Sequence, residues 1–129
     1  MTDNELKQYS PLTLAFMGDA VYEQLVREKI VTQANMPVRK LHDLTIEYVR
    51  AEFQAKAVKR LCDEKLLTEN EQDIFRMGRN SSGVTPPKHS TVAEYRAATG
   101  LECIFGYLHL AGQDSRAREL FELIWNGGR

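Results

Sequence analysis

Two apolar segments, far apart in the chain, each contain a single acidic residue close to glycine. Segment 14–22 is apolar throughout except for Asp19, which directly follows Gly18. Segment 99–106 contains Glu102 in a mainly apolar run with a glycine on each side. A helix that is apolar nearly all round is buried on most of its sides. We therefore expect both segments to be core helices, and both acids to be buried.

The glycines predict that these two helices cross at close range. Glycine costs about 1 kcal/mol relative to alanine in a helix interior, so a glycine kept at Gly18 suggests that another backbone comes close. Thr99, Glu102 and Gly106 fall on one helical face. If the two helices cross there, Asp19 and Glu102 meet. An alternative is that Asp19 forms a salt bridge with an arginine at the crossing.

Two carboxylates in one pocket of low dielectric constant repel each other, and a bound cation resolves this repulsion. A hard divalent ion with oxygen ligands, Mg²⁺ above all, takes one or two protein carboxylates and keeps several waters. Such an ion lowers the pKa of a bound water and stabilises the charge on a phosphate. The pair thus predicts a metal site for phosphate chemistry.

Start and stop signals divide the chain into further helices. Ser10 and Pro11 suit the N-cap and first position of a helix, and residues 35–37 interrupt the chain. Residues 41–65 have apolar positions at helical spacing, which fits one bent helix or two abutting ones. No segment alternates with period two, so we predict an all-α fold.

Two capping-box patterns mark later helices. Thr68 to Glu71 begins a helix to about Gly78, and Thr91 to Glu94 begins a long one through Leu110. Gly112 is the expected stop, Asp114 caps a final helix, and residues 80–90 are expected to be a loop.

The bulk properties fit one domain spanning all 129 residues, with a core at about 9–127. The longest apolar runs are far short of the ~20 residues that span a bilayer, and the first residues are polar, which predicts a cytoplasmic protein. Cys62 and Cys103 are expected to be packed thiols. Three scattered histidines do not predict a zinc site.

The charge distribution offers candidates for contact with phosphate. The net charge is −1, but residues 76–96 contain four basic residues and His89 against Glu94 alone. On charge alone, a solvated mixed surface explains this bias equally well.

At the two acidic motifs the sequence resembles a known family. Segment 14–23 resembles the signature of ribonuclease III catalytic domains, whose centre is a Leu-Gly-Asp-Ala-Val helix. Segment 99–106 is similar to that family's second acidic motif, a glutamate followed four residues later by glycine. The motif order, the 78–81 turn and the short length are similar to the Mini-III subfamily, which lacks a double-stranded-RNA-binding domain.

The resemblance implies a ribonuclease III-like fold and a Mg²⁺-dependent endoribonuclease. Asp19 and Glu102 would be the catalytic metal ligands. A homodimer would place two sites on one double-stranded RNA and leave 5′-phosphate and 3′-hydroxyl ends. The implied substrate is the stem of the large-subunit (23S) ribosomal RNA precursor, and a large-subunit ribosomal protein is a candidate assisting partner. The duplex would be gripped by these residues: Arg76, Arg79, Asn80, Lys88 and Arg96.

Two positions depart from the family pattern. Ribonuclease III has a carboxylate four residues before the signature aspartate and another three before the second glutamate, where this chain has Ala15 and Thr99. The departures favour an alternative, a catalytically inactive RNA-binding or ribosome-associated module with the same fold. A helical protein-interaction domain is a third interpretation, and it leaves the charge bias of residues 76–96 unexplained.

Overall fold

The computed structural model describes residues 1–81 and 90–127, and that part of the chain is helical without a strand. The all-α prediction is thereby confirmed. The described helices are α1 (Asp3–Leu6), α2 (Pro11–Gln33), α3 (Val38–Val49), α4 (Ala51–Asp63), α5 (Glu69–Ser81), α6 (Val92–Leu110) and α7 (Asp114–Gly127).

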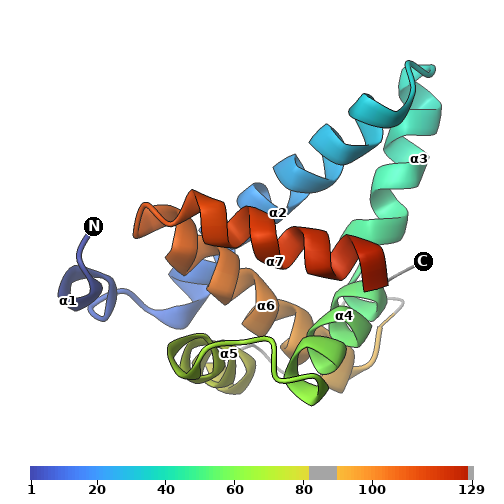
Figure 1. Ribbon diagram of the computed structural model, residues 1–129. Helices are drawn as coiled ribbons and strands as arrows, with labels where there is room; N and C mark the ends of the chain where they lie inside the picture. The colour runs from blue at the N-terminus through green and yellow to red at the C-terminus, as the bar shows by residue number, and fades with distance from the viewer. Residues whose placement is uncertain (82–89, 128–129) are drawn as a thin grey trace.

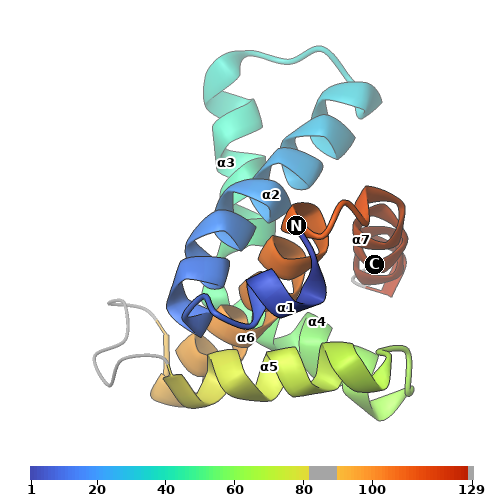
Figure 2. The same ribbon diagram turned by 90° about the vertical axis from the view of Figure 1, so that its left-hand side faces the viewer.

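Helix α6 forms the centre of the fold. Its residues from Ala98 to Leu108 are buried except for Glu102, and helices α2, α4, α5 and α7 surround it (Figures 1 and 2). The far end of α2 and helix α3 project together beyond this body as a helical hairpin (Figures 1 and 2). A helix covered on nearly every side needs apolar residues all round, which explains why the α6 sequence has no polar face.

Local capping chemistry fixes the helix starts. The Ser10 hydroxyl accepts from the backbone N–H of Thr13 at 3.2 Å, and Pro11 is the first residue of α2. The predicted capping boxes at Thr68 and Thr91 are both present. A third one, at Thr2, starts the short α1, which the sequence analysis did not predict.

The structure also sharpens several predicted boundaries. Residues 41–65 form parts of two helices because Arg50 adopts an extended conformation between α3 and α4. Helix α5 continues to Ser81, beyond the predicted end at Gly78. Gly112, with a φ of 76°, ends the turn after α6, and Asp114 is the first residue of α7.

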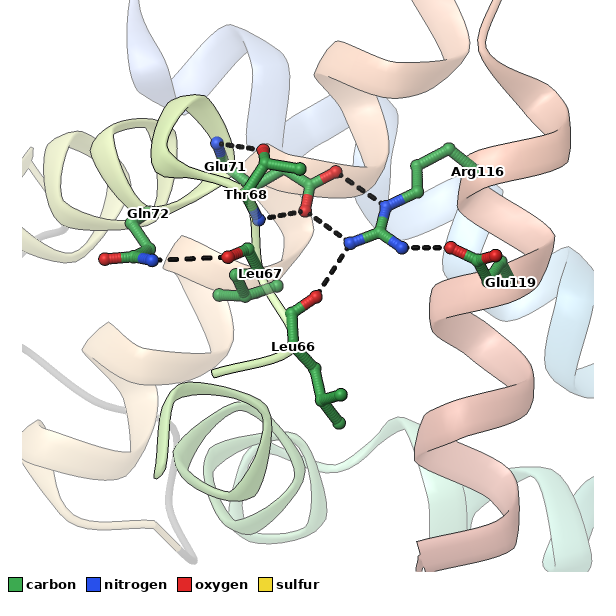
Figure 3. A network of polar contacts seen from close by, with 7 residues as sticks. All are labelled: Leu66, Leu67, Thr68, Glu71, Gln72, Arg116 and Glu119. Atoms are coloured by element: carbon green, nitrogen blue, oxygen red, sulfur yellow. Dashed lines mark hydrogen bonds and ion pairs between the residues drawn. The ribbon is translucent and has the colours of Figure 1, made fainter. Parts of the chain in front are cut away.

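An ion pair between the buried Glu71 and the partly buried Arg116 joins α5 to α7 (Figure 3). The Arg116 guanidinium donates to both carboxylate oxygens of Glu71, at 2.9 and 2.8 Å, and to the Leu66 carbonyl at 2.8 Å. Burial alone would raise the pKa of Glu71, but hydrogen bonds from Arg116 and Thr68 outweigh it, so the pKa lies below its ordinary value. The charged pair therefore stays ionised and holds α7 against the core.

Among residues 1–81 and 90–127, none of the helices combines the length and apolar character needed to cross a membrane.

Candidate functional site

Helices α2 and α6 cross backbone to backbone at two glycines. A Cβ atom added to Gly18 would lie 1.6 Å from the carbonyl oxygen of Glu102. A Cβ atom added to Gly106 would lie 1.9 Å from the carbonyl oxygen of Leu14. Neither position has room for any side chain. The predicted close crossing is therefore confirmed, and it explains why glycine occupies two helix interiors where alanine would favour the helix.

The crossing brings the two acidic side chains together. Asp19 comes from α2 and Glu102 from α6, and the two carboxyl groups lie close enough for the charge of Asp19 to act on Glu102. Within the described ranges, neither acid forms an ion pair with lysine or arginine. The alternative of an Asp19–arginine salt bridge is thus wrong.

The expectation that both acids are buried is wrong for Asp19, which is exposed, whereas Glu102 is partly buried. The reason is that α2 packs on α6 with one face and turns the other outward. Phe16 is 81% exposed and Leu12 48% exposed on that outer face. An apolar run cannot reveal which of its faces this chain leaves uncovered, so the sequence predicted burial all round.

Burial and the neighbouring Asp19 make Glu102 a weak acid. Burial, the negative charge of Asp19 and the hydrogen bond between the two groups raise the pKa of Glu102 to about 8. A hydrogen bond from Gln54 opposes the shift. At neutral pH the Asp19–Glu102 pair therefore keeps a proton, which offsets negative charge that a bound cation would otherwise balance.

Glu102 opens onto a cleft of about 370 Å³ between α6 and the start of α4. Thr99 and Tyr95 line it on the α6 side, and Gln54 and Glu52 on the α4 side. Glu52 is paired with Lys56 at 3.3 Å, so its charge is already balanced. The cleft gives solvent and a ligand access to the Glu102 carboxyl group.

The site has two carboxylates rather than a larger acidic cluster. In the described part of the chain, no group of three or more histidine, cysteine, aspartate or glutamate side chains could hold a metal ion together. The two departures from the family pattern have structural roles instead. Ala15 is buried in the core, and the buried Thr99 donates its hydroxyl to the Tyr95 carbonyl at 3.0 Å.

Sequence reasoning missed Gln54, a buried amide at the site. Its Nε2 donates to the Val49 carbonyl at 2.7 Å and to Glu102 Oε2 at 3.4 Å. Val58 and Leu61 follow at helical spacing and are buried on the same face of α4. A polar residue at helical spacing from these apolar residues is the sequence signal that could have identified Gln54.

The predicted RNA-binding residues lie where α5 ends and α6 begins. Arg76, Arg79 and Asn80 are exposed on α5, and Arg96 is partly exposed on the second turn of α6. Arg76 pairs with Asp73, and the Arg79 guanidinium lies 5.5 Å from the centre of the Phe75 ring. Helix α5 packs against α6 (Figure 2). Lys88, with its neighbour His89, lies outside the described residues.

Comparison with known proteins decides the family. The family described as Ribonuclease III domain matches residues 12–113, a segment that contains both acids. The chain belongs to the ribonuclease III family. It is an endoribonuclease of the Mini-III type, because relatives named Mini-ribonuclease 3 match it over most of its length. One from Thermoanaerobacter sp. (strain X514) is 50% identical over 123 residues, covering 95% of this chain and 85% of the relative.

Two further comparisons agree. A Mini-ribonuclease 3 from Staphylococcus aureus is 38% identical over 122 residues, covering 95% of this chain and 91% of the relative. A crystal structure of a protein from Fusobacterium nucleatum superimposes with a TM-score of 0.84 at 27% identity, covering 97% of this chain and 98% of that one. The likeness thus extends over the whole helical arrangement described above.

Proposed function

We propose that this chain cleaves double-stranded RNA with the help of Mg²⁺, and that Asp19 and Glu102 are the protein ligands of the ion. The observation that carries the proposal is the contact between two carboxyl groups that have no cationic partner among the described residues. Oxygen donors suit Mg²⁺, which binds through one or two carboxylates. The raised pKa of Glu102 supports a site built for added positive charge.

The protein's own part in the reaction follows from this arrangement. The glycine crossing places Asp19 and Glu102 next to each other, where they would hold the ion once both carboxyl groups are ionised. A bound divalent ion supplies an activated water and stabilises charge on the phosphate. Arg76, Arg79, Asn80, Lys88 and Arg96 are proposed to seat the duplex through its phosphates, since the deep, narrow major groove of A-form RNA excludes side chains.

We further propose a homodimer. Leu12 and Phe16 are one helical turn apart and expose apolar surface on the same helix as Asp19. A second copy of the chain would cover this surface and would bring a second site to the opposite strand of one duplex. The products would then carry 5′-phosphate and 3′-hydroxyl ends.

The proposed substrate is the stem of the 23S ribosomal RNA precursor, processed in the cytoplasm, with a large-subunit ribosomal protein as the candidate assisting partner. Both unpaired thiols, Cys62 and Cys103, fit a reducing compartment.

The test is cleavage of a duplex RNA in Mg²⁺ and in EDTA. We expect Mg²⁺-dependent cleavage by the parent and a loss of at least a hundredfold in Asp19→Asn and in Glu102→Gln, on the scale at which one electrostatic group contributes to catalysis. Glu23→Gln is the matched control, one helical turn after Asp19 and paired with Arg27 at 3.0 Å. Full cleavage by both site variants would remove the site assignment, and duplex binding without any cleavage would show a binding module instead.

A further inference from the structure

Gln54 has a set of contacts that fixes the orientation of its amide. The side chain is 2% exposed, in the first turn of α4. Its Nε2 donates to the Val49 carbonyl at 2.7 Å and to Glu102 Oε2 at 3.4 Å. Both partners are acceptors, so the opposite amide orientation would place oxygen against two oxygens. The nitrogen therefore faces Glu102.

The amide oxygen of Gln54 has no hydrogen-bond donor among the described residues. In the described part of the chain, Oε1 is buried and has no hydrogen-bond donor within reach. A buried acceptor without a donor costs free energy. Gln54 lines the same cleft as Glu102. The contacts of Gln54 thus satisfy its amide nitrogen, which faces Glu102, and leave its amide oxygen without a donor.

A purely local role does not account for these observations. Gln72 on α5 makes the same backbone contact, since its Nε2 donates to the carbonyl five residues earlier, that of Leu67, at 3.2 Å. Gln72 is only partly buried, and among the described residues its amide donates to the Leu67 carbonyl and to no carboxylate. The contact to Glu102 and the burial are what set Gln54 apart.

We propose that Gln54 is a positioning residue, which anchors the Glu102 carboxylate between the end of α3 and Asp19 and thereby sets the affinity of the site for a divalent ion. The inference rests on the proposed function, because it assigns Gln54 to the same site. The 3.4 Å contact is long for a hydrogen bond and holds the carboxyl group only loosely. It acts through Glu102 and does not touch the substrate.

The test compares Gln54→Met with Gln72→Met, a pair in which each variant loses a side-chain contact to a backbone carbonyl but only the first loses a contact to Glu102. Mn²⁺ binding is measured by electron paramagnetic resonance of the free ion, without RNA. We expect about tenfold weaker Mn²⁺ binding in Gln54→Met, the usual scale for loss of a group that orients a metal ligand. In Gln54→Met, the Mg²⁺ concentration that half-saturates cleavage should rise by the same factor, whereas kcat at saturating Mg²⁺ should stay within about threefold of the parent. Gln72→Met should show no change in either quantity.

Other outcomes separate this inference from the proposed function. Lower melting temperatures in both methionine variants with unchanged Mn²⁺ affinity would show a merely structural amide and would overturn the inference alone. Should Gln54→Met not fold, Gln54→Glu serves instead, because a third carboxylate beside Glu102 should tighten Mn²⁺ binding; an unchanged affinity would again overturn it. A parent that neither binds Mn²⁺ nor cleaves duplex RNA would overturn the proposed function, and this inference with it.

Discussion

The substitution Gly18→Ala tests the crossing that builds the site. The added methyl group would lie 1.6 Å from the Glu102 carbonyl oxygen, whereas ordinary van der Waals contact begins at 3.4 Å. Helices α2 and α6 must therefore separate by up to the difference, about 1.8 Å. A gap of only 0.5–1 Å already forfeits roughly a quarter to a half of the attraction between the atoms involved. The backbone carbonyl cannot move aside as a flexible side chain would.

The cost of the clash exceeds the gain in helix propensity, so Gly18→Ala should lower the stability of the fold. Overpacking a core costs about 1–3 kcal/mol and occasionally more, and a backbone clash between two helices falls at the upper end. Alanine returns about 1 kcal/mol through its helix propensity. We expect the free energy of unfolding to fall by about 2 kcal/mol, measured by urea denaturation. Ala20→Gly, exposed on the same helix, is the control and should cost only the ~1 kcal/mol of propensity. A Gly18→Ala variant more stable than the parent would refute the close crossing.

Two further predictions concern the acid pair and the exposed apolar face. In EDTA, the free energy of unfolding should decrease as the pH rises from 4.5 to about 8, because folded Glu102 keeps a proton in this window that the unfolded chain has lost. Denaturation curves at several pH values should show that the free energy of unfolding falls less steeply with pH in Glu102→Gln than in the parent. Equal slopes in the two proteins would contradict the raised pKa of Glu102. Phe16→Arg should convert the proposed dimer to a monomer in sedimentation equilibrium while the circular dichroism spectrum stays helical. A parent that is monomeric at high concentration would contradict the proposal for this face.

Much of the fold could be predicted because helix starts depend on local chemistry. Ser10, Thr68 and Thr91 cap helices through their own hydroxyl groups, and no distant contact is needed for that. The glycines at the crossing were equally informative, since a glycine in a helix interior needs a neighbour to explain it. The two acids could therefore be paired from the sequence, and their contact follows from the crossing.

Other features depend on tertiary contacts that a linear pattern does not record. Arg50 breaks the stretch between α3 and α4 without glycine or proline. The exposure of Asp19 depends on which face of α2 this chain leaves uncovered. Gln54 acquires its importance only when α4 packs beside α6. The roles of Asp19, Glu102 and the predicted RNA-binding residues remain predictions, as does the single-domain assignment for residues 1–129.

The most direct test of the account is a calorimetric titration of the parent with Mn²⁺ at pH 7, in two buffers with different ionisation enthalpies. The pair holds a proton in the absence of an ion, so we expect one ion bound per chain with release of about one proton. Asp19→Asn and Glu102→Gln should abolish this binding, and Glu23→Gln should keep it. Equal Mn²⁺ binding by the parent and both site variants would show that the ion is held elsewhere.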